Sequence, residues 1–326
     1  MIPDEISIID RFFRPLAGGG AFDLRDDAGI IMPQSGTDLV VTTDMVARDV
    51  HFLLDPPETI AKKALRVNLS DLTAKGATPL GYMLSLALSP EIDEDWLTRF
   101  AEGLREDHAR YGVELLGGDT IAVPDRTVIS VSAFGSVPSG RMVRRSGGRP
   151  GDLLYVSGAI GLSTLGLALL RGEEGPWPTF WRATRESLVH RYRVPEPPTE
   201  LAPLLLRFAA AAMDISDGLV GDCDKLCAAS GCSAVIEATA VVTAFKAPGR
   251  ELLARLLTGG EDFEILAAVP PDNSVAFEAA AAVAGVLVTR IGQLIEGEKP
   301  TEVLFEGRPL VLARRAFVHG AGERRG

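Results

Sequence analysis

The order of apolar and polar residues in the first part of the chain changes repeatedly between two periods, which predicts strands mixed with helices. Apolar residues recur near every 3.6 positions in two long stretches, so helices are expected at 57–76 and 92–111. Alternating patterns and short runs of β-branched residues predict strands at 39–43, 82–88, 113–116 and 127–137. The first of these strands is rich in Val and is expected to be short and buried.

A second series of elements begins after residues 138–151, which are rich in Gly, Pro, Ser and Arg. Strands are predicted at 152–157, 234–237, 264–269 and from 286 onward, and loops at 172–178 and around 195–198. Helices are predicted at 161–171, from Ser216 or Asp217 to about Ser230, at 250–257 and at 272–284. We therefore predict a two-domain α/β (α+β) protein, with domains at residues 1–140 and 141–326 and antiparallel pairing in its sheets.

Short aspartate-bearing stretches follow many of these elements, where a strand is expected to meet a loop or a helix. Mg²⁺ takes oxygen ligands, keeps several waters and is usually held by a few carboxylates together with substrate phosphates. Asp, Ser and Thr residues dispersed over tight turns are typical of such a site. The six stretches are Arg25-Asp26-Asp27, Thr42-Thr43-Asp44, Asn68-Leu69-Ser70-Asp71, Gly117-Gly118-Asp119, Asp214-Ile215-Ser216-Asp217-Gly218 and Gly259-Gly260-Glu261-Asp262.

Taken one at a time, these stretches have ordinary structural interpretations. Asp26 and Asp27 alone are typical of a solvated turn, and Asp71 of the exposed side of a helix. Ser216 and Asp217 are natural caps for the helix that follows them, although two carboxylates and a serine exceed what one cap requires. Their number and their order along the chain are what favour a site for metal and phosphate.

Composition narrows the possible functions further. The net charge of −11 at pH 7 disfavours nucleic-acid binding, which needs basic patches to replace phosphate counterions. The three cysteines, Cys223, Cys227 and Cys232, cluster in one predicted helix and are expected to be small buried thiols. The N-terminus lacks the apolar run of a signal peptide, and no window reaches the roughly 18 uncharged apolar residues of a membrane span. The protein is therefore expected to be cytoplasmic, with no membrane partner.

Several familiar catalytic motifs are absent from the sequence. It contains no P-loop G-x-x-x-x-G-K-[ST], no complete dinucleotide-binding G-x-G-x-x-G and no kinase H-R-D. It also lacks the G-x-S-x-G of serine hydrolases and the H-E-x-x-H of zinc peptidases. The dispersed carboxylates therefore remain the main candidates for chemistry.

In their order along the chain, these stretches resemble the thiamine-monophosphate kinases. That family belongs to the superfamily of aminoimidazole ribonucleotide synthetase, selenophosphate synthetase and a hydrogenase maturation protein. The stretches that carry the resemblance are Thr42-Thr43-Asp44 with His51-Phe52, Lys63–Leu72, Gly117-Gly118-Asp119-Thr120, Arg145-Ser146-Gly147 with Pro150-Gly151-Asp152, Asp214–Leu219 and Gly259–Glu264.

The resemblance implies a two-domain fold like that of aminoimidazole ribonucleotide synthetase, with the N-terminal sheets of a homodimer paired into a barrel. It implies transfer of a phosphoryl group from ATP to thiamine monophosphate, assisted by several Mg²⁺ ions. Carried over residue by residue, Mg²⁺ ligands are expected at Asp27, Thr42, Thr43, Asp44, Asp71, Asp119, Asp214 and Asp217. Contacts to ATP are expected from Gly118, Asp119, Arg145 and Ser216, and contacts to the substrate from His51, Glu261 and Phe317.

The chain departs from the family pattern at Arg25, where the family usually has a glycine before two aspartates. Two other readings stay open. One is another ATP-dependent enzyme of the superfamily, either aminoimidazole ribonucleotide synthetase or a selenophosphate synthetase-like enzyme, although the first cysteine here is Cys223 and a selenophosphate synthetase should carry one near its N-terminus. The other is a non-catalytic nucleotide-binding protein, which the retention of every predicted carboxylate disfavours.

Overall fold

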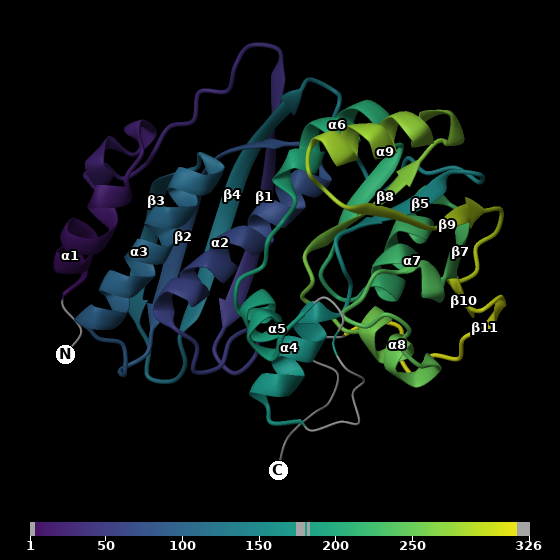
Figure 1. The fold of residues 1–326 in the computed structure, drawn as a ribbon. Coiled ribbons are helices and arrows are strands. Elements are labelled where there is room, and N and C mark those ends of the chain that lie inside the picture. The colour runs from purple at the N-terminus through teal and green to yellow at the C-terminus, as the bar shows by residue number, and fades with distance from the viewer. Residues whose placement is uncertain (1–3, 174–179, 181–182, 318–326) are drawn as a thin grey trace. The chain divides into compact units, whose positions relative to one another are not determined.

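The computed structural model describes residues 4–173, 180 and 183–317 (Figure 1). The chain forms two compact units. The N-terminal unit comprises Met1–Leu72, Ala77–Met142 and Arg193–Pro195, and the C-terminal unit comprises Thr73–Gly76, Val143–Tyr192 and Glu196–Gly326. Each unit has its own sheet with helices, which confirms the prediction of two mixed α/β parts.

The N-terminal unit is built on a four-stranded sheet with strand order β1-β4-β2-β3. Strand β4 pairs antiparallel with β1 and β2, whereas β2 and β3 run parallel. The strands are β1 Thr37–Ala47, β2 Thr78–Leu88, β3 Glu114–Ala122 and β4 Val128–Pro138. The helical segments are α1 Glu5–Ile8, η1 Ile9–Phe13, η2 Arg14–Leu16, η3 Gly19–Leu24, α2 Pro57–Ala74 and α3 Glu94–Tyr111.

The two faces of this sheet differ in what covers them. Helices α2 and α3 lie along the same side of the sheet (Figure 1), and a Cβ added at Gly135 of β4 would lie 3.3 Å from the Leu72 side chain of α2. The opposite face exposes apolar side chains, among them Val41 of β1, which is 58% exposed. Only Val40 and Val46 of β1 are buried. The prediction of a short, buried strand at 39–43 is therefore wrong in length and burial, because β1 is a long edge strand with one uncovered side.

A buried ion pair joins α2 to α3. Arg66 donates through Nε and Nη2 to the two carboxylate oxygens of Asp107, at 2.8 and 2.7 Å, and both side chains are buried. The remaining nitrogen, Nη1, donates to the carbonyl oxygen of Pro195 at 3.0 Å. Arg193, two residues before that proline, donates to Asp55 at 2.6 Å. This short segment thus belongs with the N-terminal unit, although the chain enters and leaves it from the C-terminal unit.

A second polar contact in this unit joins β2 to α3. The hydroxyl of the buried Tyr82 lies 2.7 Å from Nε2 of His108. Burial, together with the nearby Arg105 guanidinium, lowers the pKa of His108 to about 4. At neutral pH the imidazole is therefore uncharged and accepts the hydrogen bond from the tyrosine.

This contact predicts a pH dependence of stability. Between pH 6.5 and pH 4 the unfolded chain binds a proton at His108 that the folded protein excludes. The free energy of unfolding should therefore fall as the pH decreases through this window, by about 1–2 kcal/mol, because solvent screens the partly exposed ring. Urea unfolding at several pH values across the window should show this loss in the wild type but not in His108→Gln. The exposed His190→Gln is the control and should follow the wild type; parallel profiles for all three proteins would contradict the assignment.

The C-terminal unit is built on a seven-stranded sheet with strand order β11-β10-β7-β9-β5-β8-β6. Neighbouring strands are antiparallel except β10 and β7, which run parallel. The strands are β5 Leu153–Ser157, β6 Ala211–Ile215, β7 Ser233–Glu237, β8 Glu264–Val269, β9 Val288–Ile295, β10 Glu302–Phe305 and β11 Arg308–Pro309. The helices are α4 Leu162–Leu170, α5 Arg185–Arg193, α6 Ala202–Phe208, α7 Leu219–Ser230, α8 Arg250–Leu257 and α9 Ser274–Val283, with 3₁₀ turns η4 Thr199–Leu201, η5 Ala238–Ala240 and η6 Pro271–Asn273.

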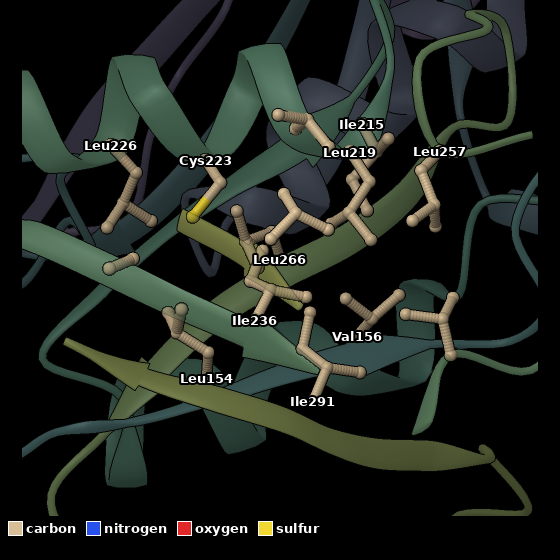
Figure 2. Packing of buried hydrophobic residues seen from close by; sticks show 14 of the residues in the cluster. Leu154, Val156, Ile215, Leu219, Cys223, Leu226, Ile236, Leu257, Leu266 and Ile291 are labelled. Atoms are coloured by element: carbon tan, nitrogen blue, oxygen red, sulfur yellow. The ribbon is translucent and has the colours of Figure 1, made fainter. Parts of the chain in front are cut away.

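The main hydrophobic core of this unit lies between α7 and the sheet. Figure 2 shows Leu154 of β5, Leu266 of β8 and Ile291 of β9 in the same buried cluster as Cys223 of α7. All three cysteines are buried and free, which confirms the prediction of small buried thiols. The loop predicted at 172–178 lies largely outside the described residues. Within the described ranges, none of the helices combines the length and apolarity needed to cross a membrane.

Candidate functional site

Thr42, Asp44 and Asp71 lie on the helix-covered side of the N-terminal sheet, at its β1 edge. Thr42 and Asp44 are two positions apart in β1 and so point to the same face. The Thr42 hydroxyl donates to Oδ2 of Asp71 in α2 at 2.5 Å, which links the strand to the helix. This edge therefore carries two carboxylates and a hydroxyl, so every atom there that could bind a metal ion is an oxygen.

Thr43 and Asp119 lie on the exposed face of the same sheet. Thr43 accepts a hydrogen bond from the Ser132 hydroxyl at 3.1 Å, and Asp119 is in register with Ser85. Asp119 belongs to β3, at the opposite edge of the sheet from β1. Three strand spacings, or about 14 Å, separate those edges. The N-terminal unit therefore does not bring Asp119 together with Asp44.

Two of the predicted turns are not turns. Asp44 lies inside β1, whose ladder with β4 continues to Ala47, and Asp119 lies inside β3, which continues to Ala122. The expectation that these aspartates terminate strands is wrong, because the backbone pairing extends beyond the apolar runs from which the strands were predicted. Gly118 has a structural reason to be glycine, since a Cβ there would lie 1.8 Å from a carbonyl oxygen of β2.

Asp27 lies in an exposed loop that follows η3. Its backbone N–H donates to Oδ1 of Asp26 at 2.8 Å. A Cβ at Gly29 would lie 2.5 Å from the Leu116 carbonyl oxygen, so the loop runs beside β3, the strand that carries Asp119. Arg25 has φ −112° and ψ −3°, a conformation that L-residues adopt, so this loop does not need the glycine that the family usually has there.

His51 lies in the loop after β1 and is held by two hydrogen bonds. The backbone N–H of Ala47 donates to Nδ1 at 3.2 Å, and the buried Lys63 ammonium donates to the His51 carbonyl oxygen at 2.6 Å. Because Nδ1 accepts, the proton of the neutral ring is on Nε2, which is therefore a hydrogen-bond donor. A cavity of 210 Å³ lies beside this loop and is lined in part by Phe52 and Asp55.

In the C-terminal unit, three stretches that are distant in sequence meet at the carboxyl end of β6. The backbone N–H of Glu261 donates to the Ser216 carbonyl oxygen at 2.7 Å, and that of Phe317 donates to the Asp217 carbonyl oxygen at 2.9 Å. A Cβ at Gly260 would lie 2.5 Å from the same oxygen of Ser216, so the turns are in close contact. Residues predicted separately for ATP, metal and substrate are thus brought together here, with the buried Asp214 near the end of β6.

Ser216 and Asp217 do not cap α7, so the prediction of these two as natural caps is wrong. The helix begins at Leu219, and its N-cap position is occupied by Gly218, which has φ 116° and makes no side-chain cap. A Cβ at Gly218 would also lie 2.9 Å from the Thr258 backbone. The close packing of the two turns therefore requires glycine at the position where a capping side chain was expected.

The Ser216-Asp217 turn is held instead by Asp222 and Lys225, which the sequence analysis did not identify. The buried Asp222 accepts backbone hydrogen bonds from Ser216 and Asp217, both at 3.0 Å. The Lys225 ammonium lies 2.5 Å from Oδ2 of Asp217 and 2.7 Å from Oδ1 of Asp222. Burial raises the pKa of Asp222, and Lys225 opposes that shift. An acidic residue in the first turn of a helix, with lysine three positions later, is the sequence signal for this arrangement.

Glu261 lies on a turn whose backbone is strained. Glu261 and Phe263 have φ 72° and 52°, in the left-handed region that side chains usually avoid. Asp262 between them is buried and accepts from the N–H groups of Gly161 and Ser163, at 2.7 and 3.2 Å, at the start of α4. Burial raises the pKa of Asp262 to about 7. The neighbouring structure thus holds Glu261 in a conformation that the isolated turn would not favour.

Arg145 lies at the other end of β6 from this cluster. Its carbonyl oxygen accepts from the Ser230 hydroxyl at 2.6 Å, at the last residue of α7. The N–H of Ala212, near the start of β6, donates to the carbonyl oxygen of the preceding arginine, Arg144, at 3.1 Å. The C-terminal unit therefore does not bring the Arg145 backbone next to Ser216, which follows the far end of β6.

The predicted metal ligands form small sets. Over residues 4–173, 180 and 183–317, no group of three or more His, Cys, Asp or Glu side chains is arranged to hold a metal ion. Asp71 is hydrogen-bonded to Thr42, with Asp44 on the same face of β1, whereas Asp214 lies in β6 of the C-terminal unit and Asp217 in the turn that follows it. Oxygen donors in such small numbers fit Mg²⁺, which is usually held by one or two carboxylates while phosphates and waters complete its shell.

The sequence matches the family models described as AIR synthase related protein, N-terminal domain, over residues 25–137, and C-terminal domain, over residues 149–304. It is 38% identical over 332 residues to a thiamine-monophosphate kinase from Caulobacter vibrioides, covering 98% of this chain and 91% of that protein. The crystal structure of thiamine-monophosphate kinase from Stenotrophomonas maltophilia K279a is 33% identical with a TM-score of 0.81, over 94% of this chain and 98% of that one. A solved structure described as AaThiL complexed with AMPPCP and TMP is 28% identical with a TM-score of 0.74, over 97% and 96%.

Proposed function

The chain belongs to the thiamine-monophosphate kinase family of AIR synthase related proteins, and on this premise we propose that it transfers the γ-phosphoryl group of ATP to thiamine monophosphate. The products are thiamine diphosphate and ADP. A related structure that contains AMPPCP and TMP supports both substrates. The absence of a P-loop agrees with an ATP site built from dispersed turns.

The observation that carries this proposal is the meeting of three stretches, distant in sequence, at the carboxyl end of β6. Backbone hydrogen bonds of 2.7 and 2.9 Å tie the Ser216-Asp217 turn to Glu261 and to Phe317. Of these residues, Ser216 is proposed for ATP, Asp217 for Mg²⁺, and Glu261 and Phe317 for the substrate. Phosphoryl transfer needs the nucleotide, the metal ion and the acceptor at one place, and these proposed roles supply all three there.

The acceptor in this reaction does not need a general base. Thiamine monophosphate is a phosphate monoester, whose second pKa is about 6, so at neutral pH it is largely a dianion and already a nucleophile. We expect direct, in-line displacement: a terminal oxygen of the acceptor phosphate forms the new P–O bond, and ADP leaves with the electrons of the broken one. The task of the protein is then to position two polyanions and to neutralise their charge.

The carboxylates are proposed to hold several Mg²⁺ ions. Bound Mg²⁺ supplies neutralisation of the phosphate charges that the two substrates bring together. Several ions are proposed because the candidate ligands lie in separate sets and Asp119 is remote from Asp44 within its unit. The proposed ligands are Asp27, Thr42, Thr43, Asp44, Asp71, Asp119, Asp214 and Asp217.

Substrate recognition is proposed to use Arg145, His51, Glu261 and Phe317. The guanidinium of Arg145 suits a bidentate contact to a phosphate of ATP, and the Nε2–H of His51 suits a phosphate oxygen. The thiazolium ring of the substrate is positively charged, which suits the Glu261 carboxylate and the face of the Phe317 ring.

We further propose a cytoplasmic homodimer in which the exposed faces of two N-terminal sheets pair into a barrel. On that face, Val41, Met45 and Ile121 are 58%, 59% and 53% exposed. Apolar side chains clustered on one face favour burial against a partner. In a symmetric dimer, the same face of a second copy would pack against it and bury these side chains.

The proposed function predicts that ADP release depends on both Mg²⁺ and thiamine monophosphate. Purified protein with ATP alone should release ADP only slowly, and the two additions together should produce ADP and thiamine diphosphate in equal amounts. Coupled ADP detection and chromatography of the products measure this. ADP release that does not respond to thiamine monophosphate would contradict the proposal. Label from γ-³²P-ATP retained on denatured protein would contradict direct transfer.

A further inference from the structure

The last described residues of the chain run along one face of α7. Arg315, Ala316 and Phe317 lie beside Asp224, Gly221 and Asp217, so the segment advances towards the start of the helix. Gly221 and Asp224 are three residues apart in α7 and therefore lie on one face, and Asp217 lies in the turn just before the helix. The segment thus delivers Phe317 to the turn that carries Ser216 and Asp217.

An ion pair fixes one end of this segment against α7. Arg315 donates through Nε and Nη2 to the two carboxylate oxygens of Asp224, at 2.5 and 2.9 Å. Nη2 also donates to the Thr301 carbonyl oxygen at 2.8 Å, and the Thr301 N–H donates to the same carboxylate at 2.7 Å. A bidentate guanidinium–carboxylate pair specifies orientation as well as position. Arg315 is therefore held in one geometry by α7 and by Thr301, the residue just before β10.

A glycine in α7 allows the segment to approach the helix. A Cβ at Gly221 would lie 2.4 Å from the Ala316 Cβ and 3.2 Å from the Arg315 carbonyl oxygen. Any side chain at this helix position would push the segment away. One residue later, the Phe317 N–H donates to the Asp217 carbonyl oxygen at 2.9 Å.

We propose that Arg315, Asp224 and Gly221 are positioning residues that hold Phe317 at the substrate side of the site. This inference rests on the proposed function, in which Phe317 contacts thiamine monophosphate. None of the three is proposed to contact the reacting atoms. They fix the position of the C-terminal segment, and the segment positions Phe317. Their effect is on binding of the acceptor and not on the transfer step or on ATP.

Steady-state kinetics test this role with two variants that act differently. Arg315→Gln removes the ion pair, and Gly221→Ala adds a methyl group where Ala316 lies, while alanine is the better helix former. Each should raise the KM for thiamine monophosphate by about 5- to 20-fold, the size of one lost ring contact, with kcat and the KM for ATP changed less than about 2-fold. Arg314→Gln, which alters the exposed neighbouring arginine, is the matched control and should behave as the wild type.

A double-variant comparison separates positioning from a general loss of structure. Phe317→Ala should reproduce the rise in KM, and Phe317→Ala combined with Arg315→Gln should be no worse than Phe317→Ala alone, because both act through one contact. The inference would be overturned if the rises in KM caused by the two single substitutions multiplied in the double variant. A fall in kcat and a rise in the KM for ATP as large as the change in the KM for thiamine monophosphate would also overturn it, as would unchanged kinetics in Arg315→Gln.

Amide hydrogen exchange tests the same contacts without relying on activity. Peptides that include Phe317 should exchange faster in Arg315→Gln and Gly221→Ala than in the wild type and Arg314→Gln, because the bond to the Asp217 carbonyl is released. Unchanged exchange would overturn the inference. A wild type that exchanges as expected but does not convert thiamine monophosphate would instead count against the proposed function.

Discussion

Asp44→Asn is expected to lower kcat by at least about 100-fold while leaving the fold intact, the size of effect seen when a group that stabilises developing charge is removed. Asp44 is exposed at the β1 edge, on the same side as the Thr42–Asp71 hydrogen bond of 2.5 Å. Asparagine keeps the shape of the side chain but loses the charge that would hold Mg²⁺. Turnover at saturating ATP and thiamine monophosphate measures the loss.

The control for this experiment is Asp125→Asn, which neutralises an exposed carboxylate in the connection between β3 and β4. It should retain near-normal turnover. A higher Mg²⁺ concentration should partly restore Asp44→Asn if the carboxylate acts by holding the ion. Near-normal activity of Asp44→Asn at limiting Mg²⁺ would refute its role as a ligand.

The largest effect on stability is expected from breaking the buried ion pair between α2 and α3. Asp107→Ala leaves the Arg66 guanidinium buried without its carboxylate and should lower the free energy of unfolding of the N-terminal unit by about 3–5 kcal/mol. Both side chains of the wild-type pair are almost fully buried, at 4% and 1% exposed. Urea unfolding, followed with a probe in the N-terminal unit, measures the change.

A second ion pair joins the same two helices and provides the control. Nη2 of Arg99 in α3 lies 2.9 Å from Oε2 of Glu58 in α2, but the two side chains are 47% and 33% exposed. Arg99→Ala should lower the free energy of unfolding by less than about 1 kcal/mol, because an exposed ion pair contributes little to stability. Replacing Arg66 and Asp107 together with Met and Leu should recover most of the loss, since no buried charge remains. A loss of only about 1 kcal/mol in Asp107→Ala would show that water reaches Arg66.

The elements that follow their own periodicity were predicted well. The spacing of apolar residues predicts helices at 57–76 and 92–111, and the structure has α2 at Pro57–Ala74 and α3 at Glu94–Tyr111. Both keep an apolar side at helical spacing over 18 residues, and this pattern depends only on local order. Strand β1 was misjudged because the burial of a strand depends on what covers each face, which is decided by distant parts of the chain.

The sequence proposes candidate site residues but does not predict the contacts among them. Ser216, Asp217, Glu261 and Phe317 were identified by resemblance, and the structure brings them together through backbone hydrogen bonds that leave no mark in sequence. Asp222 was missed because its role is to bind the backbone of the turn and not a ligand. The separation of Asp44 from Asp119 also followed only from strand order and register.

The short segment Arg193–Pro195 has a consequence for how this protein is made. When the ribosome has released only the first 142 residues, the sheet and helices of the N-terminal unit are complete, but Arg66 still lacks the Pro195 carbonyl and Asp55 lacks Arg193. About 50 further residues must be translated before these partners exist, which takes roughly 3–10 s at about 5–20 residues per second. During this time the nascent N-terminal unit has the Arg66 guanidinium with only part of its hydrogen bonds. A gene fragment that ends at the apparent domain boundary would encode a protein that never acquires the missing partners.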